Sequence, residues 1–208
     1  QSTIEYINNL FKQIPDTRIF ISPGNHDPYI TNSYYSKYSW NENVYIFNQK
    51  INKVSYNDCD IYGYGFQDFY CKDSKIENIK IENPEKVNIL IAHGSLNDIK
   101  KSEEDYFNYN PINKNNLKNK HFDYVALGHI HKTNFDENEN IIYPGSLISF
   151  GFDELGKHGM IVGEITKNNR KIKFVNIDNR EFKEEKLDIS KIISKEELVE
   201  KINNLKIE

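Results

Sequence analysis

Apolar residues recur with two different periods along the chain. The N-terminal stretch has the helical period, with apolar residues at Ile4, Ile7, Leu10, Phe11 and Ile14. This spacing predicts an amphipathic helix over residues 2–14, which Pro15 ends. Short apolar runs between Asn, Asp and Gly residues predict strands. They occupy residues 18–22, 44–47, 51–56, 60–64, 87–92, 122–127, 141–143, 159–165 and 172–177. Strands that first alternate with helices and then follow one another are typical of an α/β layered fold with a mixed sheet.

The segments between these runs are less regular. Residues 29–40 read as a loop or short helix, and residues 73–85 as a surface helix or loop. Residues 97–120 form a long polar segment with no obvious element, which we interpret as a functional lid. Near the C-terminal end, Ser194 and Glu197 match a capping box, and Leu198, Ile202 and Leu205 continue as one apolar helix face.

Composition narrows the class of protein. The chain has 208 residues and a net charge of −4, enough for one large domain or one domain plus a fragment. The negative net charge argues against a broad basic surface that binds nucleic acid. Any polyanionic ligand would instead be bound at a local site, for instance by metal ions. No apolar run approaches the ~20 residues of a membrane helix, so no membrane association is expected. Two cysteines and no signal peptide favour a reduced, cytoplasmic setting.

Candidate chemistry lies where three of the predicted strands end. Asn25 and His26 follow the first, His93 ends the second, and His129 and His131 follow the third, each group beside a glycine. Open α/β sheets place ligand sites outside the carboxyl ends of their strands. Imidazole and amide donors suit first-row metal ions, and the absence of thiolates there argues against a structural zinc site. The sequence therefore predicts one shared metal pocket. His121 and His158 lack this context and are interpreted as ordinary surface or core histidines.

These residues resemble a known signature. The strings Gly24-Asn25-His26-Asp27 and Gly128-His129-Ile130-His131, with His93 between them, are similar to the later half of the calcineurin-like metallophosphoesterase signature. Three further strings narrow the resemblance to the SbcD-like DNA repair exonuclease branch: Tyr124-Val125-Ala126-Leu127, Tyr143-Pro144-Gly145-Ser146 and Phe152-Asp153-Glu154. The similarity runs from about residue 5 to 190, and Asp178–Phe182 resembles the strand that leaves the catalytic core.

The resemblance implies a four-layer α/β/β/α sandwich with two divalent metal ions, usually Mn²⁺. Asn25, His93 and His129 match ligands of the second ion, and His131 matches a ligand of the first. His26 matches the general acid that protonates the leaving oxygen. Two such ions clamp a phosphate and activate a bridging water. Asp27 is expected to pin its loop.

The resemblance is incomplete. The family carries an Asp-x-His and a Gly-Asp ahead of these motifs, and this sequence contains neither. We therefore expect an N-terminally shortened chain whose metal sites are empty or partly filled, and which is inactive alone. Residues 1–178 would be the later part of the core, and residues 179–208 an exit strand and the first helix of a C-terminal region.

Three functions fit this reading. The first is a metal-dependent DNA repair exonuclease, present as a fragment. The others are a small-molecule phosphoesterase of the same superfamily and a non-catalytic interaction module with the phosphoesterase fold. For the full-length nuclease the resemblance implies DNA as substrate and a coiled-coil ATPase as partner, with homodimerisation left open. This chain alone is not expected to bind the ATPase.

Overall fold

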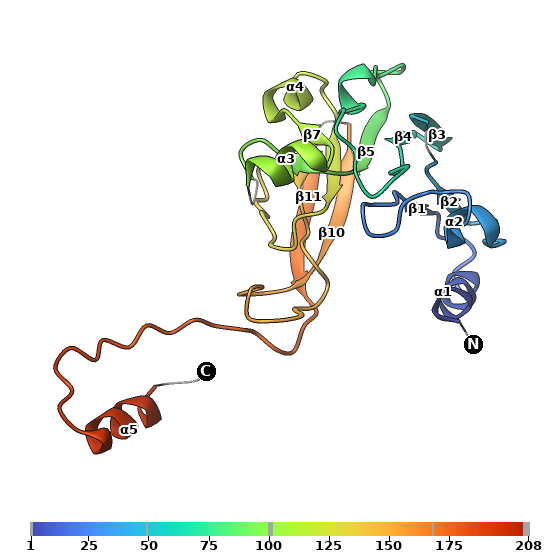
Figure 1. The fold of residues 1–208 in the computed structure, drawn as a ribbon. Coiled ribbons are helices and arrows are strands. Elements are labelled where there is room, and N and C mark those ends of the chain that lie inside the picture. Colours follow the sequence, from blue (N-terminus) through green and yellow to red (C-terminus); the bar gives the residue numbers. More distant parts are fainter. Residues whose placement is uncertain (1, 49, 100–101, 168, 206–208) are drawn as a thin grey trace.

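A central mixed sheet organises the computed structural model, which describes residues 2–48, 50–99, 102–167 and 169–205 (Figure 1). Its strands lie in the order β3-β4-β5-β8-β9. They are β3 (Asn52–Tyr56), β4 (Cys59–Gly63), β5 (Val87–His93), β8 (Tyr124–Gly128) and β9 (Ile141–Ile142). β3 runs antiparallel to β4, and the other neighbours are parallel. The mixed sheet and the α/β class that the sequence predicts are confirmed.

The two faces of this sheet are covered differently. Leu90, Val125 and Leu127 belong to the larger apolar cluster, while Ile89 and Ala126 pack on the smaller one. This alternation is the period-2 pattern of a sheet buried on both faces. The larger cluster also holds Ile76, Leu117 and other residues of the connecting segments.

Short elements cover the face with the larger cluster. They are η1 (Ile76–Asn78), α3 (Glu103–Asn108), α4 (Lys114–Lys118) and the parallel pair β6 (Ser95–Leu96) and β7 (Pro111–Ile112). The prediction of an element-free lid over residues 97–120 is therefore wrong. Side-chain caps start both helices, since Ser102 accepts from the Asp105 amide and Asn113 from the Asn116 amide.

A long antiparallel hairpin covers the other face. It consists of β10 (Gly159–Thr166) and β11 (Asn169–Asn176). Ile161, Ile165 and Ile172 pack on Tyr124 and Ile142 of the central sheet. Helices, central sheet and hairpin thus form three stacked layers of the expected four-layer sandwich. No helix among the described residues joins the cluster under the hairpin.

The N-terminal elements form a unit beside the end of β4. They are α1 (Thr3–Lys12), β1 (Ile19–Ile21), α2 (Tyr34–Lys37) and β2 (Val44–Ile46), with β1 and β2 paired in parallel. The Asn43 side chain donates to the carbonyls of Phe11, Ile14 and Thr17, at 3.0, 3.0 and 3.1 Å, and so closes the C-terminal end of α1. A bond from the Phe66 amide to the Pro23 carbonyl ties the loop after β1 to the segment after β4.

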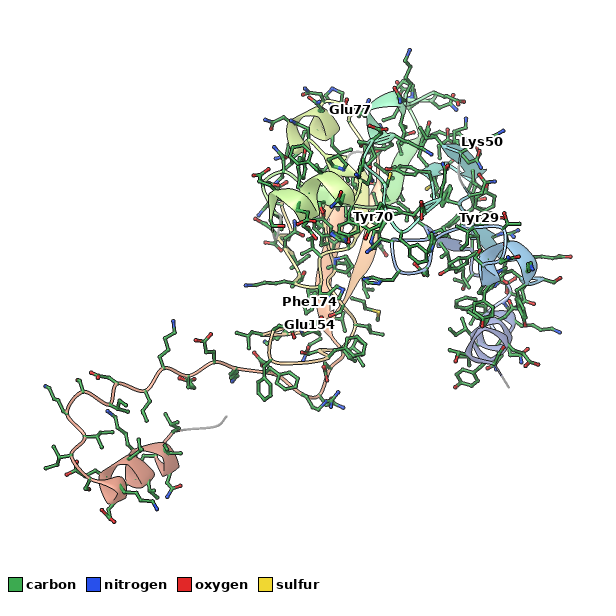
Figure 2. The ribbon with its side chains drawn as sticks, viewed as in Figure 1. Tyr29, Lys50, Tyr70, Glu77, Glu154 and Phe174 are labelled. Carbon is green, nitrogen blue, oxygen red and sulfur yellow. The ribbon has the colours of Figure 1, made fainter. Side chains whose placement is uncertain are left out.

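The C-terminal region departs from the prediction in one respect. Residues 177–193 belong to no helix or strand, so the expected exit strand is not formed. The charged run Glu181–Lys186 lacks the alternating apolar residues that a strand would bury. This segment leads away from the sheet to α5 (Lys195–Asn203), as Figures 1 and 2 show. Ser194 caps α5 as predicted, but the Glu197 carboxylate accepts from the Ile193 amide instead of the Ser194 amide. The division at residue 178 stays a prediction.

Across the described parts of the chain, no helix has both the length and the apolar character needed to cross a bilayer.

Candidate metal centre

Three predicted site residues meet where β1, β5 and β8 end. β5 and β8 are parallel neighbours, and their register pairs His93 with Gly128. His129, the next residue, therefore lies beside His93, with 5.2 Å between the ring centroids. Asn25 arrives from the loop after β1, and its Oδ1 lies 2.7 Å from Nε2 of His93. The topology thus unites residues that are far apart in the sequence.

The loop that carries Asn25 is held from within. The Gly24 amide donates to Oδ1 of Asp27 at 2.9 Å, and the Tyr35 hydroxyl donates to Oδ2 of the same carboxylate at 2.6 Å. Asp27 therefore pins the loop, as the sequence predicts. Burial is the largest cause that raises the pKa of the Tyr35 hydroxyl, followed by its bond to Asp27, so the phenol stays a donor at neutral pH.

His93 is enclosed on several sides. A Cβ added to Gly24 would lie 2.5 Å from its ring, and one added to Gly128 would lie 3.0 Å from its Nδ1. The Phe66 ring packs edge-on, with 5.3 Å between centroids. Glycine is thus needed at position 24 because the imidazole occupies the space of a side chain there, and at position 128 a Cβ would make a tight contact with the same ring.

Burial also sets the protonation of His93. It lowers the pKa of His93 to about 3, with smaller contributions from the positive charges of His129, His26 and His131. The ring is therefore neutral at physiological pH, the form that binds metal ions.

His129 has an unusual backbone. Its φ is +109°, a region that costs a non-glycine residue about 1–3 kcal/mol and that tends to occur at functional sites. Its Nε2 lies 3.3 Å from Oδ2 of Asp105, which also accepts from the Ser95 hydroxyl at 3.2 Å. The Tyr109 ring packs on the imidazole, with 5.0 Å between centroids.

The two remaining predicted residues face more open surroundings. His26 is exposed in the loop after Asn25. The side chain of His131 is 46% exposed, and its Nδ1 contacts the carboxylate of Glu154. The structure thus joins Asn25 and His129 to His93, while His26 follows Asn25 in the same loop and His131 contacts Glu154.

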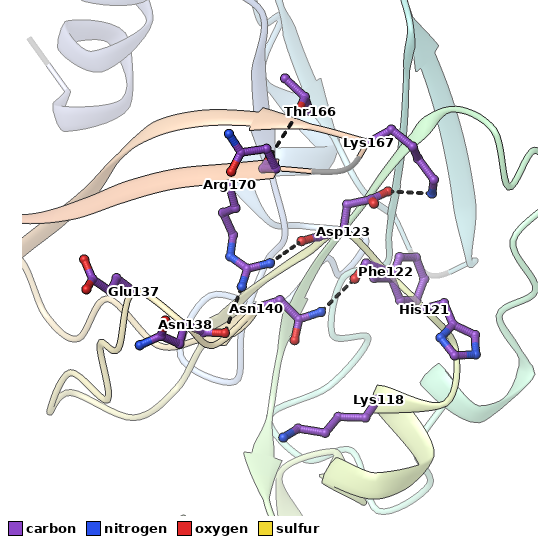
Figure 3. A pocket seen from close by; sticks show the side chains of 11 residues that line it. Lys118, His121, Phe122, Asp123, Glu137, Asn138, Asn140, Thr166, Lys167 and Arg170 are labelled. Carbon is purple, nitrogen blue, oxygen red and sulfur yellow. Dashed lines mark hydrogen bonds and ion pairs between the residues drawn. The ribbon is translucent and has the colours of Figure 1, made fainter.

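The other two histidines do not belong to this centre. His158 is buried and bonds to the Ser146 hydroxyl at 2.8 Å, so its interpretation as a core histidine is confirmed. His121 is exposed and borders a polar pocket of about 550 Å³ (Figure 3). This pocket lies at the N-terminal end of β8, whereas His129 follows the C-terminal end of the same strand. The cations drawn there bond within the protein: Lys167 pairs with the Asp123 carboxylate at 3.0 Å, and Arg170 donates to the Asp123 carbonyl at 3.3 Å.

Sequence reasoning missed two acidic residues of the centre, Asp105 and Glu154. Asp105 lies within the segment predicted as a lid, and the cap pair Ser102-x-x-Asp105 is the signal that could have revealed its helix. Glu154 belongs to the string Phe152-Asp153-Glu154, which contributed to the family resemblance but received no role in the predicted centre.

The residue types of this cluster suit one metal ion, and the spacing of one pair of donor atoms is compatible with it. Two ligand atoms about 2.1 Å from a common ion and at a right angle lie about 3.0 Å apart, close to the 2.7 Å between Asn25 Oδ1 and His93 Nε2. Because an amide oxygen only accepts, Nε2 carries the proton in that contact, and a bound metal ion would replace it. In the described residues, no three His, Cys, Asp or Glu side chains are arranged to hold a metal ion by themselves.

These observations define a class of protein. Residues 1–133 match the calcineurin-like phosphoesterase family, and the chain belongs to this family. The matched region includes all five predicted site residues and the ends of β1, β5 and β8.

Two relatives give a narrower comparison. The chain is 29% identical over 184 residues to the SbcD subunit of the nuclease SbcCD of Staphylococcus epidermidis, covering 76% of the chain and 47% of that protein. It is 26% identical over 164 residues to the uncharacterized metallophosphoesterase YhaO of Bacillus subtilis, covering 75% of the chain and 39% of that protein. The chain thus spans less than half the length of each relative. An SbcD-like branch of the family accommodates both similarities.

Proposed function

We propose that this chain carries the histidine-rich part of a two-metal phosphodiesterase that cleaves DNA. The observation that carries the proposal is the contact of Asn25, His93 and His129 from three strand ends, with His129 in a strained backbone conformation. The similarity to a nuclease subunit supports DNA as the substrate. A coiled-coil ATPase partner and homodimerisation belong to the same proposal for the whole protein.

In this mechanism Asn25, His93 and His129 hold the second ion, and His131 is a ligand of the first. Bound Mn²⁺ ions would supply positive charge to the phosphate and lower the pKa of a water molecule. The neutral His93 ring would bind a metal ion through Nε2 in place of the single proton that this atom carries in its contact with Asn25. His26, exposed beside Asn25, donates a proton to the leaving oxygen of the cleaved strand.

The donor set of the second ion is neutral. Two imidazoles and one amide bring no negative charge to balance a divalent cation, so we propose that carboxylates from an Asp-x-His and a Gly-Asp motif, absent from these residues, complete the centre. We expect the 208-residue chain alone to bind Mn²⁺ weakly and to hydrolyse phosphodiesters negligibly. The protein extended with those motifs should show Mn²⁺-dependent hydrolysis.

The role of His26 gives a sharp test in the extended protein. The His26→Ala variant should hydrolyse DNA about 10²–10⁴-fold more slowly, the usual range for loss of a general acid. It should hydrolyse bis(p-nitrophenyl) phosphate at a rate much closer to wild type, because p-nitrophenolate leaves without a proton. His121→Ala is the matched control, since that histidine lies outside the centre.

Two outcomes would contradict the proposal. Equal losses on both substrates would show that His26 is not a leaving-group acid. Efficient hydrolysis of the small diester with none of linear or plasmid DNA would favour a small-molecule phosphoesterase, which the net charge of −4 would suit.

A further inference from the structure

Glu154 is a partly buried residue whose carboxylate has several donors around it. It lies in the loop between β9 and β10, and its side chain is 10% exposed. Nδ1 of His131 contacts Oε1, while the Ser146 hydroxyl and the Phe150 amide donate to Oε2 at 3.3 and 3.0 Å. A carboxylate satisfied in this way has one preferred orientation.

The backbone of Glu154 is held as firmly as its side chain. Its carbonyl accepts from the Ser149 hydroxyl at 2.8 Å and lies 3.2 Å from Nε2 of the buried His158. The Ser149 amide in turn donates to Asp178 at 2.8 Å. The loop therefore presents the carboxylate from a fixed position at the base of the hairpin.

The His131 ring, by contrast, is exposed, and the contact with Glu154 is what orients it. Its side chain is 46% exposed, and an exposed imidazole samples several rotamers and both tautomers. An ionised carboxylate only accepts hydrogen bonds, so the contact with Glu154 requires the proton on Nδ1. Nε2 is then left as the only ring atom with a free lone pair.

We propose that Glu154 is a positioning residue for His131, which fixes the ring in the Nδ1–H tautomer and so reserves Nε2 for a metal ion. This inference rests on the proposed function, because it gives His131 the part of a metal ligand. Carboxylate–histidine pairs of this kind orient metal ligands, and their loss commonly weakens metal affinity by about 10–100-fold.

The first test reads the tautomer in the metal-free 208-residue chain by ¹⁵N NMR of labelled histidine. Wild-type His131 should show a protonated Nδ1 and a bare Nε2. Glu154→Ala should shift it to the Nε2–H tautomer that free imidazole side chains prefer, and Glu154→Gln, which keeps an acceptor oxygen, should restore Nδ1–H. Asp153→Ala is the matched control: Asp153 lines, together with His131 and Glu154, a cavity of about 350 Å³, and its loss should leave the His131 tautomer unchanged.

The second test measures Mn²⁺ affinity by calorimetry in the protein extended with the Asp-x-His and Gly-Asp motifs. Glu154→Ala should bind the first ion about 10–100-fold more weakly, Glu154→Gln should lie between it and wild type, and Asp153→Ala should match wild type. A general loss of structure would not be rescued by glutamine.

The results separate this inference from the proposed function. A wild-type His131 with its proton on Nε2 overturns the role of Glu154 even if no variant folds, and so does equal Mn²⁺ affinity in wild type and Glu154→Ala. A wild-type protein that binds no Mn²⁺ overturns the proposed function, while the NMR result still decides the contact between His131 and Glu154.

Discussion

At the residue scale, the position of His93 depends on a glycine, because the His93 ring occupies the space that a side chain at position 24 would need. Gly24 leaves the space that the imidazole fills, and a methyl group there would lie 2.5 Å from Nδ1 and Cε1 of His93. Neither the ring nor the pinned loop can move without breaking the contact between His93 and Asn25. Gly24 is therefore as necessary to the centre as the groups that would bind the ion.

A single methyl group at position 24 should therefore disturb both stability and metal binding. Gly24→Ala should lower the free energy of unfolding by about 1–3 kcal/mol, as overpacking does, and should lower Mn²⁺ affinity and hydrolysis in the extended protein. Denaturant unfolding and calorimetry measure the two effects. Gly151→Ala is the control, because a Cβ there would meet only the flexible Asp153 carboxylate at 3.0 Å. Unchanged Mn²⁺ affinity in Gly24→Ala would contradict the role given to His93.

Residues at strand ends could be predicted from the sequence, and their acidic neighbours could not. Asn25, His93 and His129 lie at the ends of apolar runs: the parallel pairing of β5 and β8 brings His93 and His129 together, and the loop after β1 adds Asn25. Asp105 and Glu154 lie 24 and 23 residues from the histidines that they contact. Nothing local in the sequence encodes such a distant contact, which depends on how the connecting loops pack.

At the element scale, Asp60 joins three neighbouring segments at the edge of the sheet. Its buried carboxylate on β4 bonds to Ser55 of β3 at 2.7 Å and to Asn83 before β5 at 2.9 Å. The ammonium groups of Lys53 and Lys86 lie 3.6 and 3.4 Å away. Burial alone would raise the pKa of Asp60, but the bonds from Asn83, Ser55 and Lys86 and the charge of Lys53 lower it to about 2.

This carboxylate gives stability a specific pH dependence. Because its pKa is below the ordinary 3.8, its contribution is present above pH 3.8 and is lost as the pH falls through about 2. Asp60→Asn should lower the free energy of unfolding at pH 7 by about 1–3 kcal/mol, since buried donors lose their acceptor. The gap between variant and wild type should narrow below pH 4, as followed by urea unfolding with circular dichroism. Asp58→Asn is the control, and a gap that stays constant down to pH 2 would contradict the assignment.

Elements were predicted best where the apolar period was strong. The strands of the central sheet and α1 follow from it, with ends that differ by one or two residues. α3 and α4 were missed because each is a short, mostly polar helix that starts from a side-chain cap, and Leu117 alone among the residues of α4 is fully buried. The predicted exit strand is wrong because the prediction came from the family resemblance, whereas the residues of that segment are mostly charged.

At the scale of the whole molecule, the strand order β3-β4-β5-β8-β9 decides where the chemistry lies. The parallel strands β5 and β8 end at the same edge, and the loop after β1 is tied to that edge through Pro23 and Phe66. This order rests on pairings between distant segments, so the sequence predicted the α/β class and the shared edge but not the topology.

The central claim is that Asn25, His93 and His129 together bind a metal ion. The most direct measurement is anomalous X-ray scattering at the manganese edge from crystals of this chain soaked in excess Mn²⁺. We predict one anomalous peak about 2.0–2.3 Å from Asn25 Oδ1 and from a nitrogen of each histidine. The contact between His129 and Asp105 should open to admit it. A saturating soak that places manganese elsewhere, or leaves Asn25 and His93 still hydrogen-bonded to each other, would contradict the account.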